Sequence, residues 1–150
     1  MTIRGIGLHS GEPSTVRLHP AEGPVRFRVG GLEFRPLASS VVDTTRCTVL
    51  GQHNLRLMTV EHLLAALYIR GIWEGLLIEA TGPEIPILDG SAQEWLAVFQ
   101  GLPPSGPQPE SVSGTIRVEE GRRSVLAQPA ECFSLGVIIL FTEPKIGYRR

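Results

Sequence analysis

The sequence predicts an α+β fold, in which a two-layer sandwich of one sheet and two helices is followed by the first strands of a second similar domain. Three observations predict it. Short alternating strand patterns joined by turn residues occupy most of residues 3–58, two helical patterns lie near 59–70 and 91–100, and a proline-rich stretch precedes further strand patterns. Because hairpins come before the first helix, the pattern favours a two-layer sandwich over a doubly wound parallel sheet.

Three hairpins are predicted ahead of the first helix. Each pairs two short segments across a turn rich in Gly, Pro, Asn or Ser, the residues that turn geometry favours. The paired segments are 3–9 with 14–19, 25–29 with 32–34, and 47–50 with 55–58. Val16 and Leu18 are expected to face the core, whereas His19 faces solvent. His53, at the third turn, is interpreted as a solvated loop residue.

A helix is predicted from the start of the Glu61-His62 pair to about Arg70. One face carries apolar residues at the i, i+3, i+4 and i+7 spacing of a buried stripe, namely Val60, Leu63, Leu64 and Leu67. Thr59 is expected to cap the helix, and the Glu61 carboxylate to gain from the positive end of the helix dipole. The other face carries Ala65, Ala66 and Ile69 around His62, so a second layer of protein is expected to cover it.

One buried strand and one short helix are predicted next. Residues 75–80 form an apolar strand pattern, and the prolines within 82–90 mark an extended or edge segment. Ser91 to Glu94 has the spacing of a capping box, which opens a helix through about residue 100 with Trp95 and Phe99 on its inner side.

Domain boundaries follow from a change in composition. A first α+β domain is expected over residues 1–102, a Pro/Ser/Gly-rich linker over 103–114, and an incomplete start of a second α+β domain over 115–150. In the last segment, 115–120 and 123–128 form a hairpin pattern and 133–141 a strand apolar on both faces. These 36 residues fall below the roughly 40 that usually fold without outside help.

Composition restricts the class of protein. An apolar fraction of 42% supports a packed core, and 14 basic against 15 acidic residues argue against a nucleic-acid-binding module. The apolar run at 133–141 is too short for a bilayer, which needs about 20 residues, and no signal-peptide pattern is found. The two cysteines lie far apart. We therefore expect a soluble, cytoplasmic protein with no transmembrane segment.

Glu61 and His62 are the residues most suited to catalysis or metal binding. They do not form a His-Glu-x-x-His motif, because Ala66 stands four residues after His62. The helix thus offers one nitrogen ligand, whereas a catalytic zinc takes about three protein ligands. The simpler alternative is a hydrogen-bonded structural pair with no catalytic role.

The other candidates each have a structural alternative as well. His9 follows a Gly-Ile-Gly-Leu backbone that permits close approach, but a turn residue is the simpler interpretation. Cys47 fits a small buried strand residue, and Asp89 fits a turn former that bonds its own backbone. No spacing among them forms a metal-ligand pair.

Four ordered segments nevertheless carry a family resemblance. They are GIGLHSG at 5–11, VDTTRCT at 42–48, TVEHLLAAL at 59–67 and PEIPILDGSA at 83–92. In this order they resemble the zinc-dependent UDP-3-O-acyl-N-acetylglucosamine deacetylases of lipid A biosynthesis. The resemblance extends over residues 3–150, which correspond to the first domain and the opening of the second in a family whose members are about twice this long.

The resemblance implies a zinc enzyme of two similar sandwiches of the ribosomal-S5-domain-2-like type, packed helix layer to helix layer with zinc between them. It implies that His62 is a zinc ligand and Glu61 the general base. It also implies that UDP-3-O-acyl-N-acetylglucosamine is the substrate. The residues then expected to line the substrate site are Thr45, Arg46 and Cys47, with His9 as a further candidate.

The remaining ligands of the family form a His-x-x-x-Asp motif in the second domain, which these 150 residues lack. Zinc binding and catalysis are therefore expected to require a C-terminal half, and this chain alone is expected to be inactive. Two hypotheses follow. The chain is the N-terminal half of a zinc-dependent deacetylase, or it is a catalytically inactive truncated or partial homologue.

Overall fold

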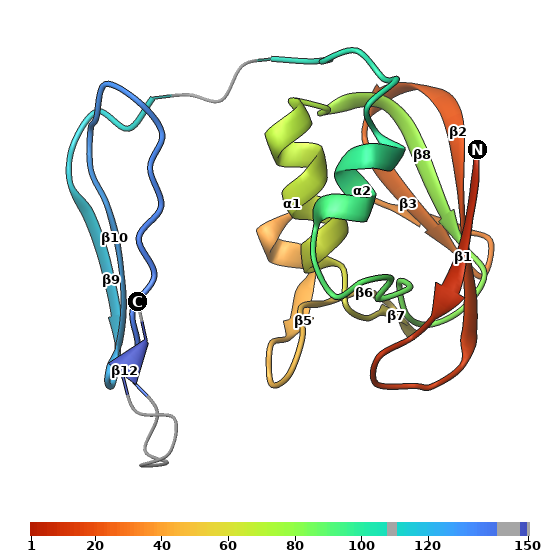
Figure 1. Ribbon diagram of the computed structural model, residues 1–150, viewed down its shortest axis with the longest axis horizontal. Coiled ribbons are helices and arrows are strands. Elements are labelled where there is room, and N and C mark those ends of the chain that lie inside the picture. Colours follow the sequence, from red (N-terminus) through yellow and green to blue (C-terminus); the bar gives the residue numbers. More distant parts are fainter. Residues whose placement is uncertain (108–110, 141–147, 150) are drawn as a thin grey trace. The chain divides into compact units, whose positions relative to one another are not determined.

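The computed structural model describes residues 1–107, 111–140 and 148–149, which fall into two compact units, Met1–Gln108 and Pro109–Arg150 (Figure 1). The class is α+β, as predicted, with mixed sheets and few helices. Within the described residues, no helix is both long and apolar enough to cross a bilayer.

The main sheet of the first unit has the strand order β1-β2-β8-β3-β4. Its strands are β1 (Thr2–Ile6), β2 (Pro13–Pro24), β3 (Arg26–Val29), β4 (Leu32–Phe34) and β8 (Glu74–Ala80). β8 pairs antiparallel with β2 and parallel with β3, which makes the sheet mixed. The first two predicted hairpins are confirmed as β1–β2 and β3–β4.

A smaller sheet holds the third predicted hairpin. It consists of β5 (Val41–Asp43), β6 (Val49–Gln52) and β7 (Leu55–Leu57), with a 3₁₀ turn at Ala38–Ser40 before it. His53 is exposed in the β6–β7 turn with a φ of 55°, which confirms it as a loop residue. β5 was not predicted, because three residues give too short an alternation to recognise.

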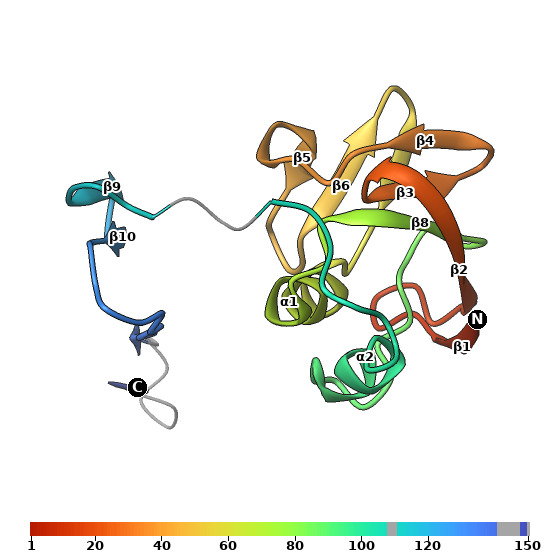
Figure 2. The same ribbon diagram turned by 90° about the horizontal axis from the view of Figure 1, so that it is seen from above.

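Two helices, α1 (Glu61–Arg70) and α2 (Gln93–Val98), lie on the same face of the main sheet (Figures 1 and 2). Leu63, Trp95 and Phe99 have no exposed surface, and Leu67 is also buried. Burial of each such side chain contributes about 1.5–3 kcal/mol, so the core fixes both helices on the sheet. Gly71, with a φ of 65°, ends α1 in the left-handed conformation.

Helix α1 begins differently from the prediction. It starts at Glu61, as expected, but Val60 precedes it in helical conformation and no side chain caps it. Thr59 has a φ of 56°, and its hydroxyl donates to Glu84 Oε1 at 2.7 Å. The expectation that Thr59 caps the helix is wrong, because a tertiary contact takes its hydroxyl.

The outer face of α1 also needs correction. Ala66 is fully buried, whereas Ala65 is exposed and Ile69 is 64% exposed. The core-facing arc is centred on Leu63 and Leu67, so Ala66, three residues after Leu63, falls within it. Ala66 therefore does not belong to the outward face, and Leu64 lies at the edge of the buried arc.

Helix α2 lacks the predicted capping box. Ser91 Oγ accepts the Gln93 backbone N–H at 3.0 Å, but the Ser91 backbone N–H donates to Asp89 Oδ1 at 2.9 Å. Asp89 thus occupies the donor that Glu94 was expected to bond. Asp89 is the turn former that the sequence indicated.

The second unit contains the predicted hairpin, formed by β9 (Ile116–Glu120) and β10 (Arg123–Ala127). The expected strand at 133–141 is wrong for residues 133–138, which pair with no strand among the described residues. Only β11 (Ile139–Leu140) is paired in this run, with β12 (Tyr148–Arg149). Phe141 lies outside the described residues. A strand apolar on both faces needs a layer on each face, and the described residues of this unit supply none.

Candidate active site

The candidate site lies at the N-terminal end of α1, beside the small sheet in Figure 1. Three chain segments meet there. The residue after Cys47 bonds Glu61, the segment 83–89 bonds the strand ends at Ile6 and Met58, and the loop between β1 and β2 bonds Glu84. Segments far apart in the sequence are thus joined by hydrogen bonds at one end of the helix.

Glu61 is held by the backbone of Thr48, the residue just before β6 of the small sheet. Its Oε2 accepts the Thr48 backbone N–H at 2.9 Å, and the Val60 N–H reaches the Thr48 carbonyl oxygen at 3.5 Å. A carboxylate fixed at one oxygen keeps its other oxygen available to a substrate or a water. The contact also places Glu61 directly beside the segment that contains Cys47.

His62, half-buried, follows Glu61 on the helix. Asp89, on the 83–89 segment, interacts electrostatically with His62. The backbone N–H and the hydroxyl of Ser91 hold the pKa of Asp89 below its ordinary value, and the nearby His62 ring has a smaller effect in the same direction. Successive helical residues point about 100° apart, so Glu61 and His62 face different directions.

The predicted substrate residues Thr45, Arg46 and Cys47 form a bend beside Glu61. The Thr45 backbone N–H and hydroxyl donate to Asp43 Oδ1 at 2.9 and 2.7 Å. These bonds hold the pKa of Asp43 below its ordinary value. Thr45 and Arg46 are exposed, whereas Cys47 is buried. Thr45 thus shapes the bend, and the Arg46 side chain remains open to solvent.

His9 is exposed in the β1–β2 turn. Its backbone N–H donates to Glu84 Oε1 at 3.0 Å and to Oε2 at 3.2 Å. The structure therefore fixes the backbone of His9 and connects it, through Glu84, to Thr59, two residues before the start of α1.

Glu84 is the site residue that sequence reasoning missed. Its side chain is fully buried, which by itself raises its pKa, but hydrogen bonds from the His9 N–H, the Thr59 hydroxyl and Ser10 lower the pKa to about 2. The available signal was a charged residue inside the apolar run Pro83-Glu84-Ile85-Pro86. A charge in such a run is stable only when it is paired or hydrogen-bonded.

The described residues fit part of a zinc site. They contain no group of three or more His, Cys, Asp or Glu side chains placed to hold a metal ion. The imidazole of His62 is a nitrogen donor of the kind that zinc prefers. Among the described residues, His62 is thus a single nitrogen donor at the start of α1, without the further donors that a catalytic zinc takes.

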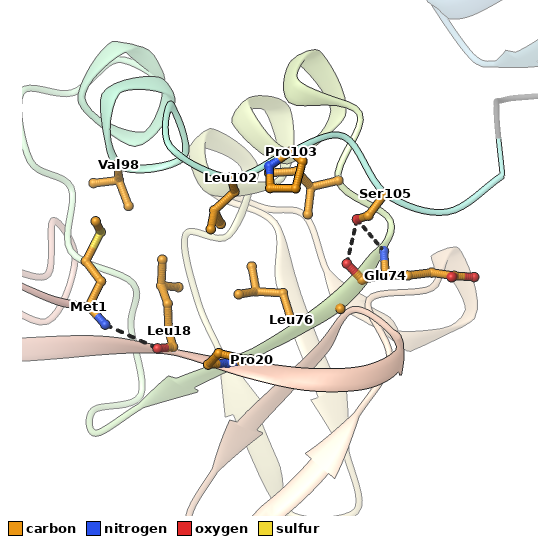
Figure 3. Close-up of a pocket in the computed structure, with 11 residues that line it drawn as sticks. Met1, Leu18, Pro20, Glu74, Leu76, Val98, Leu102, Pro103 and Ser105 are labelled. Atoms are coloured by element: carbon orange, nitrogen blue, oxygen red, sulfur yellow. Dashed lines mark hydrogen bonds between the residues drawn. The ribbon is translucent and has the colours of Figure 1, made fainter.

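A separate cavity of about 290 Å³ lies between the sheet and the segment that follows α2 (Figure 3). Apolar side chains such as Leu18, Leu76 and Leu102 line it, and Ser105 Oγ donates to the Glu74 carbonyl oxygen at its rim. None of the predicted site residues lines this cavity. The cavity lies near the C-terminal end of α1, where Ile72 lines it, whereas the candidate site lies at the N-terminal end.

An α+β domain that presents a fixed carboxylate next to an imidazole has the chemical groups of a hydrolase, and comparison with known proteins narrows this class. The sequence profile of the family described as UDP-3-O-acyl N-acetylglycosamine deacetylase matches residues 1–150. The chain belongs to this family of deacetylases.

Curated relatives agree. The UDP-3-O-acyl-N-acetylglucosamine deacetylase of Anaeromyxobacter dehalogenans is 37% identical, over 97% of this chain and 50% of its own length. That of Shewanella woodyi is 36% identical, over 95% and 50%. The bifunctional enzyme LpxC/FabZ of Bacteroides thetaiotaomicron is 36% identical, over 93% and 33%. The chain spans about half the length of the first two relatives.

Proposed function

We propose that this chain is the N-terminal half of a zinc-dependent enzyme that deacetylates UDP-3-O-acyl-N-acetylglucosamine in lipid A biosynthesis. Family membership and the coverage of about half of each full relative support the proposal. The structural observation that carries it is the Glu61 carboxylate, held at the start of α1 by the Thr48 N–H at 2.9 Å. An anchored carboxylate is suited to act as a general base.

In this proposal Glu61 takes a proton from the water that attacks the acetamide carbonyl. Hydrolysis of the C–N bond releases acetate and leaves the free amine on the sugar. His62 would hold the zinc ion together with ligands from the C-terminal half. Zinc, when bound, polarises the carbonyl and lowers the pKa of water.

The bend at 45–47 and the β1–β2 turn are proposed to face the substrate. Arg46 is exposed, and a guanidinium is a good partner for a phosphate group, which the UDP moiety supplies. Cys47 contributes a small apolar surface beside Glu61, and His9 lies in the turn that Glu84 fixes. Thr45 supports the bend through Asp43.

The domain organisation is part of the same proposal. Residues 1–102 are proposed to form the first domain, of the ribosomal-S5-domain-2-like type, and residues 103–114 a linker. Residues 115–150 would open a second similar domain, and the exposed apolar side chains of the β9–β10 hairpin fit a segment that gains its core from further chain. A cytoplasmic location remains a prediction from the sequence.

Separate roles for Glu61 and His62 are tested in the complete enzyme. Glu61→Ala is expected to abolish most acetate release and leave zinc content unchanged, because this substitution removes the base but no zinc ligand. His62→Ala is expected to lower zinc content itself. His53→Ala, an exposed turn histidine, serves as the control and should leave both quantities unchanged.

Metal analysis and acetate release decide between the two hypotheses. Equal zinc loss in Glu61→Ala and His62→Ala would contradict the separate roles. A complete protein that binds no zinc and releases no acetate would favour the catalytically inactive homologue.

A further inference from the structure

Glu84 is a buried carboxylate with no role in the chemistry proposed above. Its side chain has no exposed surface, yet it lies in the segment that joins the ends of two strands. The Met58 N–H donates to the Pro83 carbonyl oxygen at 2.8 Å, and the Ile87 N–H donates to the Ile6 carbonyl oxygen at 3.0 Å. Glu84 therefore lies where β1 and β7 end.

The carboxylate of Glu84 fixes the β1–β2 turn. It accepts the backbone N–H of His9 at both oxygens and the backbone N–H of Ser10 at Oε2, at 2.8 Å for the latter. Charge-assisted bonds of this kind are about twice as strong as neutral ones. The path of the His9 backbone therefore depends on one distant side chain.

The same carboxylate fixes the entry to α1. The Thr59 hydroxyl donates to Glu84 Oε1 at 2.7 Å, and Thr59 has a φ of 56°. A β-branched residue in the left-handed region is strained and persists only when its surroundings impose it. Thr59 stands two residues before Glu61, so this bond sets how the helix carrying Glu61 and His62 begins.

Gly7 allows the β1–β2 turn to lie close to the Glu84 carboxylate. A Cβ at this position would lie 2.4 Å from Glu84 Oε2 and 2.2 Å from Ser10 Oγ. A side chain at this position would force the Ser10 hydroxyl and the Glu84 carboxylate to shift. The glycine-rich segment 5–11, Thr59 and the segment around Glu84 therefore form one interdependent unit.

We propose that Glu84 is a positioning residue, which aligns the His9 turn with the start of α1 so that both border one reaction space. The proposal rests on the proposed function. It adds to that function the group that keeps the His9 turn and the start of α1 in place relative to each other. Because Glu84 acts through Thr59 and through backbone amides, it touches neither substrate nor metal.

The test uses matched variants of the complete enzyme. Glu84→Gln places amide hydrogens where the carboxylate accepts three donors, and Thr59→Val removes only the hydroxyl while it keeps the side-chain shape. Thr59→Ser keeps the hydroxyl and is the conservative rescue. Glu33→Gln removes a carboxylate paired with Arg26 and Arg28 on the far face of the sheet, and is the control.

Three quantities are measured below the melting temperature of each variant: kcat at saturating zinc, zinc affinity by competition with a chelator, and the amide NMR spectrum of residues 1–150. We expect Glu84→Gln and Thr59→Val to lower kcat and zinc affinity about tenfold or more, as loss of a group that orients a ligand does. Thr59→Ser and Glu33→Gln should stay within about threefold of wild type in both quantities. In the spectrum, Glu84→Gln should move the amide signals of His9 and Ser10 and those of the first turn of α1.

Folded Glu84→Gln and Thr59→Val enzymes that are less stable but have wild-type kcat and zinc affinity would overturn the proposal, since Glu84 would then serve stability alone. Unmoved signals at His9 and at the start of α1 would overturn it too. If the wild-type complete enzyme releases no acetate, the proposed function fails, and the NMR comparison decides separately whether Glu84 aligns the two segments. If Glu84→Gln does not fold, Thr59→Val against Thr59→Ser gives the decision.

Discussion

Glu84 shows how a single buried charge is made compatible with a small core. Burial disfavours the carboxylate, but bonds from His9, Thr59 and Ser10 more than offset it and lower the pKa to about 2, from an ordinary 4.5. Because the folded-state pKa is the lower one, the stabilisation is present above pH 4.5 and is lost as the pH falls towards 2.

The lowered pKa of Glu84 predicts how stability changes in acid. Between pH 5 and pH 3 the free energy of unfolding of the wild type should fall by about 2 kcal/mol more than that of Glu84→Gln, at about 1.4 kcal/mol per pKa unit. Urea unfolding of both proteins at the two pH values measures the difference. The comparison with the variant removes the contribution of the other carboxylates, and parallel pH profiles would contradict the assigned pKa.

Gly7 provides a steric prediction at the same scale. Gly7→Ala should lower the free energy of unfolding by about 1–3 kcal/mol, because its Cβ would lie within 2.4 Å of Glu84 Oε2. Gly101→Ala is the matched control, since a Cβ there meets no atom within 4 Å. Equal unfolding midpoints in urea for the two variants would mean that the turn does not pack as described.

At the scale of the element, α1 is the part of the fold that residue spacing predicted best. The bounds Glu61–Arg70 agree with the apolar stripe, because apolar residues recur at the helical spacing over almost three turns. The role of Thr59 could not be predicted, because its hydroxyl bonds a carboxylate 25 residues later in the chain. Local patterns contain no information on such long-range partners.

The inward and outward faces of α1 predict contrasting mutational costs. Leu63→Ala should lower the free energy of unfolding by about 2–5 kcal/mol, since Leu63 is fully buried. Ile69→Ala should change it by less than about 0.5 kcal/mol, since Ile69 is 64% exposed. Chemical denaturation of residues 1–150 checks both, and a large cost at Ile69 would show that some other layer covers this face.

For the whole molecule, hairpins were predictable where turn chemistry is local, as at Gly30-Gly31 between β3 and β4. The run at 133–138 was not predictable, because an apolar run becomes a strand only where neighbours pair with it and cover it. The candidate site followed from the family motifs, which include Glu61, His62, Cys47 and His9. The positioning role proposed for Glu84, in contrast, could be inferred only from the three-dimensional contacts.

Ligand number determines what residues 1–150 can do alone. The described residues hold no cluster of three metal-binding side chains. In the proposed role, His62 would meet zinc at the positive end of a helix, which slightly opposes a cation. One imidazole does not hold a catalytic zinc against water. If Glu61 and His62 have the proposed roles, residues 1–150 contain the base and one zinc ligand, and we expect no working zinc centre in this chain alone.

The most direct measurement is zinc content and acetate release for purified residues 1–150 incubated with UDP-3-O-acyl-N-acetylglucosamine, with the complete enzyme in parallel. Zinc far below one per chain and no acetate are expected for residues 1–150, with zinc-dependent acetate release by the complete enzyme. A monomeric 150-residue chain that binds stoichiometric zinc and turns over the substrate would contradict the account, because a complete metal site would then have to exist among its own side chains.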